Sequence, residues 1–225
     1  MKTVINYIKQ KTETHRSIGI AMLFSIVLLA LRIKLNRSYF YIFLVWNLFL
    51  AVIPYLITMY LTSKKNLSSI ALSLWFVTWL LFLPNAPYII TDLLHLKISR
   101  TPFLWFDILV VLSFAASGLF LFYVSLSQMQ LLLKSRLNTW YIRSITLVIL
   151  FLSALGVYLG RFLRYNSWEI LSQPQRIIED TLSIIFQPLG HKEAWLFIIG
   201  FGSFLAIGFW IFKTLSKPNY SLPST

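Results

Sequence analysis

Six long apolar runs, separated by short polar segments, constrain this chain of 225 residues more than any other feature. Most of them approach the ~20 apolar residues that cross a bilayer as a helix. A soluble domain of this length could not bury a composition that is 58% hydrophobic and 12% charged. The sequence therefore predicts an all-α polytopic membrane helix bundle. Its six transmembrane helices fall at Ser17–Ile33, Tyr39–Leu61, Ser68–Leu83, Phe103–Leu126, Ile142–Leu163 and Ala194–Phe212.

The segments around these runs predict one membrane domain over residues 1–225. Residues 1–16 form a basic N-terminus, 17–213 the helix bundle and 214–225 a polar tail. The first run leads straight into Arg32 without a small-residue cleavage site, which favours an uncleaved helix over a signal peptide. Pro174–Phe186 opens with proline and mixes apolar with charged positions. That pattern predicts a helix lying in the membrane interface, with a surface loop as the alternative.

The net charge of +13 bears on both partners and orientation. The basic residues form short clusters between apolar runs, a pattern typical of loops that set topology and contact anionic lipid headgroups, not of nucleic-acid binding. With both termini cytoplasmic, the inner segments hold 11 of the 20 Lys and Arg residues and only Glu13 of the seven acids. We therefore expect the N-terminus and the C-terminus inside. The absence of cysteine excludes disulfides and thiol chemistry.

The third run ends in a polar interruption, Phe82-Leu-Pro-Asn-Ala-Pro-Tyr-Ile-Ile-Thr-Asp-Leu-Leu-His-Leu96. Pro84 and Pro87 each lack a backbone donor and disfavour helix at the residue before them. Asn85 is a good N-cap, so we expect a break near Leu83 and a second, shorter helix beginning near Ala86. On that helix Tyr88, Asp92 and His95 are spaced i, i+4, i+7 and share a face.

Other polar residues gather at the same membrane face. Asp107 lies about five residues into the fourth run, below the interface, where a lone charge is unfavourable. Arg161 and Arg164 stand one turn apart at the end of the fifth run, after a G-x-x-x-G at Gly156 and Gly160. Because successive helices alternate in direction, we expect one polar cluster at one face, formed by Asn47, Asn85, Tyr88, Asp92, His95, Asp107, Arg161, Arg164, Asn166 and Glu169.

This cluster is open to two interpretations. Asp92 and Asp107 can neutralise Arg161 and Arg164 in an ion-pair network that joins helix ends. Alternatively, His95, Asp92 and Asp107 can act in acid–base catalysis, or Asp92-x-x-His95 can bind a divalent metal together with Asp107 or Glu169. The metal pattern is weak, because no second histidine is near. The residues indicate no particular cofactor.

Several motifs carry a resemblance to a known family. They are the stretch at 82–96, the W-x-D at 105–107, Tyr-Leu-Gly-Arg-Phe-Leu-Arg-Tyr-Asn-Ser-Trp-Glu at 158–169, and Trp46-Asn47 with Pro54-Tyr55. Between about residue 40 and residue 215 the chain resembles domain-of-unknown-function family 1361, predicted polytopic membrane proteins of bacteria. Glu169 stands where the family pattern has aspartate, which keeps the charge. The resemblance implies a bacterial membrane protein and supplies neither an activity nor catalytic residues.

Three function classes remain open at this point. The first is a non-catalytic accessory or structural protein of the cell envelope, with a membrane-protein partner or a homo-oligomer as its assembly. The second is an enzyme acting at the outer interface on a lipid headgroup or a lipid-linked phosphate, which Arg161 and Arg164 would hold. The third is a transporter or channel. The chain has no H-E-x-x-H and no glycine-rich phosphate loop, which argues against those enzyme classes.

Overall fold

The six apolar runs form helices long enough to cross a membrane, as the sequence predicts. The computed structural model describes residues 2–64, 67–98, 103–165, 172 and 174–216, with only the backbone described for 2–11 and 98. Within these ranges the structure is helical and contains no strand. The candidate spans are Thr12–Asn36, Phe43–Ser63, Ser69–Lys97, Leu104–Leu133, Thr139–Arg161 and Lys192–Leu215.

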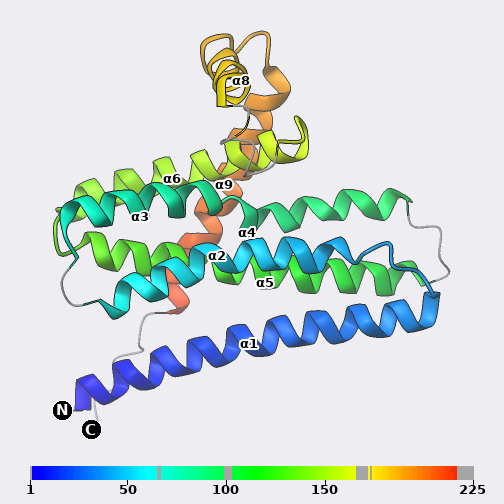
Figure 1. Ribbon diagram of the computed structural model, residues 1–225, viewed down its shortest axis with the longest axis horizontal. Helices are drawn as coiled ribbons and strands as arrows, with labels where there is room; N and C mark the ends of the chain where they lie inside the picture. Colours follow the sequence, from blue (N-terminus) through cyan, green and yellow to red (C-terminus); the bar gives the residue numbers. More distant parts are fainter. Residues whose placement is uncertain (1, 65–66, 99–102, 166–171, 173, 217–225) are drawn as a thin grey trace, which may run out of the picture. The chain divides into compact units, whose positions relative to one another are not determined.

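The chain divides into two units, residues 1–125 and 126–225, and each is described by itself. The first unit holds α1 (Lys2–Asn36), α2 (Phe43–Ser63), α3 (Ser69–Phe82), α4 (Asn85–Tyr88), η1 (Ile89–Ile98) and most of α5 (Leu104–Leu133). In Figure 1 the long helices of this unit lie side by side with nearly parallel axes. The expectation of a single membrane domain stays a prediction.

Hydroxyl and indole groups link the helices of the first unit in its apolar interior. Ser125 of α5 donates to the Pro54 carbonyl of α2 at 2.9 Å and accepts from the Trp79 indole of α3 at 2.8 Å. Ser25 of α1 lies 3.2 Å from the Ser117 hydroxyl of α5. Such bonds hold transmembrane helices together where the hydrophobic effect between helices is weak, because lipid tails are as apolar as the side chains.

The predicted interruption of the third helix is present, and its local structure differs from the expectation in two ways. α3 ends at Phe82 and α4 begins at Asn85. Asn85 is not the N-cap: that position is Pro84, and the Asn85 amide instead donates to the Phe82 carbonyl at 2.9 Å. The side-chain amide thereby supplies a donor to a backbone carbonyl in a stretch where the two prolines remove backbone donors.

The second difference is the helix type after the break. Residues 89–98 form a 3₁₀-helix, not the α-helix that the sequence spacing predicts. A 3₁₀-helix has three residues per turn, so residues i and i+3 align. Asp92 and His95 therefore keep a common face, whereas Tyr88 lies in α4 and the α-helical i, i+4 relation no longer applies to it.

The second unit is built on α6 (Thr139–Arg161) and α9 (Lys192–Leu215), with α8 (Pro174–Phe186) between them in sequence. The helix predicted at 174–186 is confirmed with the same bounds. Ile184 of α8 is buried against Leu155 and Ala194, and its carbonyl accepts from the Trp195 indole at 2.8 Å. α8 is therefore fixed to the start of α9 by both apolar packing and a hydrogen bond.

A further contact joins α8 to the segment that follows α6. The Tyr165 hydroxyl donates to Asp180 at 2.6 Å. The hydrogen bond to Asp180 raises the pKa of Tyr165 above its usual value of 10.0, because deprotonation would place two negative charges side by side. The tyrosine therefore stays neutral and continues to donate at physiological pH.

Candidate functional site

A buried ion pair joins α1 to α5 in the first unit. The Arg32 Nε atom donates to Asp107 Oδ1 at 3.0 Å, and the two side chains are 3% and 0% exposed. Arg32 lies one turn before the end of α1, and Asp107 lies in the first turn of α5. The Asp107 carboxylate, which the sequence places below the interface, is thus paired with a cation on the first helix.

The Arg32 guanidinium makes two further contacts. One guanidinium nitrogen donates to the Ser38 carbonyl at 2.8 Å, in the loop between α1 and α2. The guanidinium carbon lies 4.6 Å from the centroid of the Tyr41 ring, which is fully buried. A cation over an aromatic face is stabilised further when water is excluded. This arrangement fixes the loop to both helices and leaves the ion pair inaccessible.

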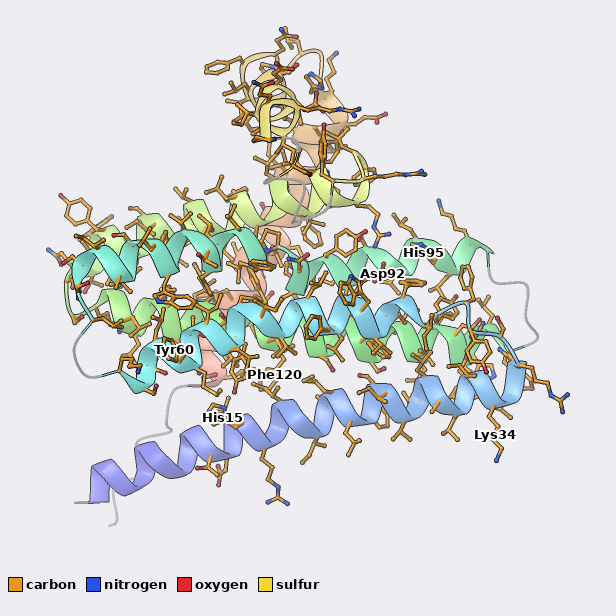
Figure 2. The ribbon with its side chains drawn as sticks, viewed as in Figure 1. His15, Lys34, Tyr60, Asp92, His95 and Phe120 are labelled. Atoms are coloured by element: carbon orange, nitrogen blue, oxygen red, sulfur yellow. The ribbon has the colours of Figure 1, made fainter. Side chains whose placement is uncertain are left out.

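A second group of polar side chains lies where α2 meets η1. The Asn47 amide donates to Asp92 Oδ2 at 2.8 Å, and His95 Nδ1 lies 4.0 Å from Asp92 Oδ1. Figure 2 labels Asp92 and His95 along the same segment. Asp92 is 1% exposed, whereas the His95 side chain is 31% exposed. Asp107 and Asp92 therefore have different neighbours. Asp107 is paired with a buried arginine, whereas Asp92 lies beside an amide and a partly exposed imidazole.

Aromatic rings form a wall beside the imidazole. The Phe43 ring centroid lies 4.9 Å from that of His95, and the Phe40 centroid lies 6.3 Å away. Both phenylalanines belong to the start of α2 and the residues just before it. One side of His95 is consequently apolar, while the edge that carries Nδ1 is turned to the carboxylate.

The metal hypothesis with Asp107 as the third ligand receives no support from this geometry, and Glu169, the alternative third ligand, lies outside the described residues. Within the described residues, no three His, Asp or Glu side chains come close enough together to hold a metal ion. Asp92 and His95 are neighbours, and Asp107 is engaged by Arg32. Two ligands alone make a poor site for a divalent cation, which binds three or four protein groups.

The other predicted residues are placed as follows. Asn85 bonds to the Phe82 carbonyl, and Tyr88 is the last residue of α4. Arg161 ends α6 and Arg164 is exposed in the loop after it, both in the second unit. Asn166 and Glu169 lie outside the described residues. The predicted pairing of Asp92 and Asp107 with Arg161 and Arg164 therefore stays a prediction.

Sequence reasoning missed Arg32 and Tyr41. The sequence pattern groups Arg32 with Lys34 and Arg37 as a basic cluster typical of topology-setting loops, although the same alternation of helix direction places the end of the first run on the face that holds Asp107. The signal was the position of Arg32, because it precedes the end of its helix by four residues and an arginine there must be paired or extend to the interface. Tyr41 had no distinguishing pattern.

Comparison with known proteins identifies the family. No curated protein and no solved structure matches the chain. Residues 46–207 match the family described as "Protein of unknown function (DUF1361)", a range that covers most of α2, all of η1 and α6, and the Asn47, Asp92 and Asp107 positions. The match extends over more than half of the sequence. This multi-pass membrane protein therefore belongs to the DUF1361 family of proteins of unknown function.

Proposed function

We propose that this protein is a non-catalytic accessory or structural protein of the bacterial cell envelope, with its N-terminus and C-terminus in the cytoplasm. In this orientation the end of the unit that carries Arg32, Asp92 and Asp107 faces outward. The observation that carries the proposal is the burial of the Arg32–Asp107 pair at 3% and 0% exposure. Neither side chain can reach a substrate, and each satisfies the other at a helix–helix contact.

The buried serine and threonine side chains of the first unit support the same role. The described serines and threonines in the interior of the first unit bond to other helices or to their own backbone. The side chains of Ser25, Thr58, Ser117 and Ser125 are buried inside the unit, at 2% exposure or less. Buried groups that bond to one another and to the backbone favour an assembly role over a transport path, which needs a polar route open to water.

The test compares the loss of stability when one partner of the ion pair is removed with the effect of replacing both partners by apolar side chains. Asp107→Asn leaves a buried guanidinium without its charge partner, which typically costs about 3–5 kcal/mol. The double variant Arg32→Met with Asp107→Leu removes both charges, and such replacements are often neutral or stabilising. Lys34→Gln is the matched control, because Lys34 lies on the same helix, is exposed and points away from the other helices in Figure 2.

The readout combines stability with function in cells. Unfolding free energy is measured in detergent, and lipid and metabolite profiles of a deletion strain are compared after complementation with each variant. A structural role predicts that the apolar double variant is stable and restores the wild-type profile, while Asp107→Asn does neither. A double variant that is fully stable but fails to complement would overturn the proposal, because the charges would then act on something other than the fold.

A second candidate is an enzyme that acts at the outer interface on a lipid headgroup or a lipid-linked phosphate. One observation favours it: His95 keeps an exposed edge beside a buried carboxylate, an arrangement that suits general acid–base chemistry. His95→Gln separates the two candidates. An enzyme would lose complementation while the unfolding free energy is maintained, whereas a structural protein would keep complementation.

A further inference from the structure

The His95 imidazole is partly exposed and can contact a molecule outside the protein, whereas the Arg32–Asp107 pair is buried and cannot. The His95 Nδ1 atom is buried and forms no hydrogen bond within the described residues. Its neighbour Asp92 Oδ1 is 4.0 Å away, about 1 Å beyond hydrogen-bonding distance. A small movement of η1 or of the ring therefore completes an Nδ1–H···Oδ1 bond. Catalytic and binding hydrogen bonds are commonly this long before a ligand is present.

Asp92 is held in place to receive that bond. Its other carboxylate oxygen, Oδ2, accepts from the Asn47 amide at 2.8 Å. Because the 3₁₀-helix aligns residues i and i+3, Asp92 and His95 project from the same side of η1. Asp92 is thus a positioning residue: it fixes which imidazole nitrogen carries the proton, as the carboxylate does in other Asp–His pairs.

The consequence concerns the opposite edge of the ring. With the proton on Nδ1, the Nε2 atom of the neutral imidazole is a hydrogen-bond acceptor. Nδ1 is one of the buried side-chain atoms that lack a hydrogen bond and Nε2 is not, so Nε2 belongs to the exposed part of a side chain that is 31% exposed. An acceptor is therefore presented outward next to the apolar rings of Phe40 and Phe43.

The position of the acceptor restricts its ligand. His95 lies three residues before the end of η1, which at 2.0 Å per residue is about 6 Å of helix. The polar headgroup region of a bilayer is about 5–7 Å thick on each side of the hydrocarbon. We propose that His95, positioned by Asp92, is a binding site for a lipid headgroup that donates a hydrogen bond through a hydroxyl or ammonium group. This site goes beyond the assembly role proposed above and is independent of it.

The experiment compares headgroups that differ in donor groups. The full-length protein carries ¹⁵N-labelled histidine and is reconstituted in nanodiscs of phosphatidylcholine, whose headgroup has no N–H or O–H donor. Phosphatidylglycerol supplies hydroxyls, phosphatidylethanolamine supplies an ammonium, and free glycerol in phosphatidylcholine nanodiscs supplies hydroxyls without a lipid. His95→Gln assigns the His95 signals by their loss.

We expect an unprotonated Nε2 with a protonated Nδ1 in the neutral His95, and an Nε2 shift when phosphatidylglycerol or phosphatidylethanolamine is added. The lipid that shifts Nε2 identifies the donor group. A shift by free glycerol alone would overturn the lipid as the source of the hydroxyl. A protonated Nε2 in every condition, or no shift with any headgroup, would overturn the site.

Asp92→Asn tests the positioning role, since it is expected to abolish the preference for the Nδ1-protonated form. A purely structural Asp92 would leave this preference unchanged. If that variant does not fold, the His95 tautomer in the wild-type protein still tests the assignment, and carbethoxylation by diethyl pyrocarbonate, followed by mass spectrometry, tests separately whether Nε2 is accessible. His191 is the internal control, because its Nε2 lies 2.9 Å from the Ser183 hydroxyl. His95 must react faster than His191, and equal rates would contradict an open Nε2.

Discussion

Gly118→Ala tests how tightly the broken third helix is docked in the first unit. A Cβ atom at Gly118 would lie 2.4 Å from the Ala86 carbonyl oxygen and 3.1 Å from Ile89 Cδ1. Ordinary contacts of this kind begin at 3.4 Å. Because the closer atom belongs to the backbone, no side-chain rotation relieves the clash. α5 and α4 must separate by about 1 Å, and the Asp92–His95 segment follows directly after α4.

The magnitude follows from two opposing terms. Replacing glycine by alanine within a helix gains up to about 1 kcal/mol of helix propensity. Forcing an extra methyl group into a close-packed contact typically costs about 1–3 kcal/mol, and a backbone contact belongs at the upper end. We therefore expect a net loss of about 1–2 kcal/mol in the free energy of unfolding, measured by circular dichroism of the protein in detergent during denaturant titration.

Two glycines provide matched controls, and a third provides a graded case. A Cβ at Gly19 or Gly200 meets nothing within 4 Å, so alanine there is expected to be neutral or stabilising. A Cβ at Gly202 would lie 2.5 Å from the Phe151 ring, a side chain that a second change, Phe151→Leu, can shorten. The second change should restore stability to Gly202→Ala. If Gly118→Ala were as stable as Gly19→Ala, the close approach of α5 to α4 would be refuted.

Three further predictions concern single contacts. Trp79→Phe removes the indole donor to Ser125, and we expect a loss of about 1 kcal/mol in unfolding free energy. Phe76→Leu is the control for aromatic packing, because the Phe76 ring lies 5.5 Å from the Trp79 ring. Asp180→Asn should lower the pKa of Tyr165 toward 10.0, measured by NMR titration of ¹³C-labelled tyrosine. Because the pKa of Tyr165 is raised in the folded state, its hydrogen bond to Asp180 is present below pH 10 and is lost as the pH rises through the pKa of the folded protein. An unchanged pKa in Asp180→Asn would contradict this contact. Arg164 has φ 62°, so Arg164→Gly should stabilise the protein by about 0.5–1 kcal/mol, and a lower melting temperature would oppose this reading.

The transmembrane helices were predictable because their cause is local. Each apolar run needs an apolar phase, and a helix satisfies its own backbone in lipid, so run and helix coincide without reference to the rest of the chain. The same holds for the interruption before Asn85, since proline removes a donor wherever the chain folds. The helix at Pro174–Phe186 was predictable for a similar reason, from its opening proline and amphipathic pattern.

Part of the candidate site could be predicted from the sequence, but the pairing of its charges could not. Alternation of helix direction brought Asn47, Asp92 and His95 to one end of the bundle, and the structure joins them. Alternation cannot say which helix lies next to which, so the partner of Asp107 required the packing of α1 against α5. Whether Arg32 pairs with Asp107 depends on how each helix is rotated about its own axis. That rotation is set by the packing of side chains from several helices at once.

The apolar runs and the two prolines are enough to predict the class of the protein, the positions of its membrane helices and the break at Pro84 and Pro87. Each of these depends on residues that are neighbours in the chain. The 3₁₀ winding of residues 89–98, the burial of Asp107 against Arg32 and the partial exposure of His95 beside Asp92 appear only once the helices are packed. Burial and pairing are properties of contacts between distant segments, and in an apolar environment each buried charge is stabilised by the group that packing brings to it.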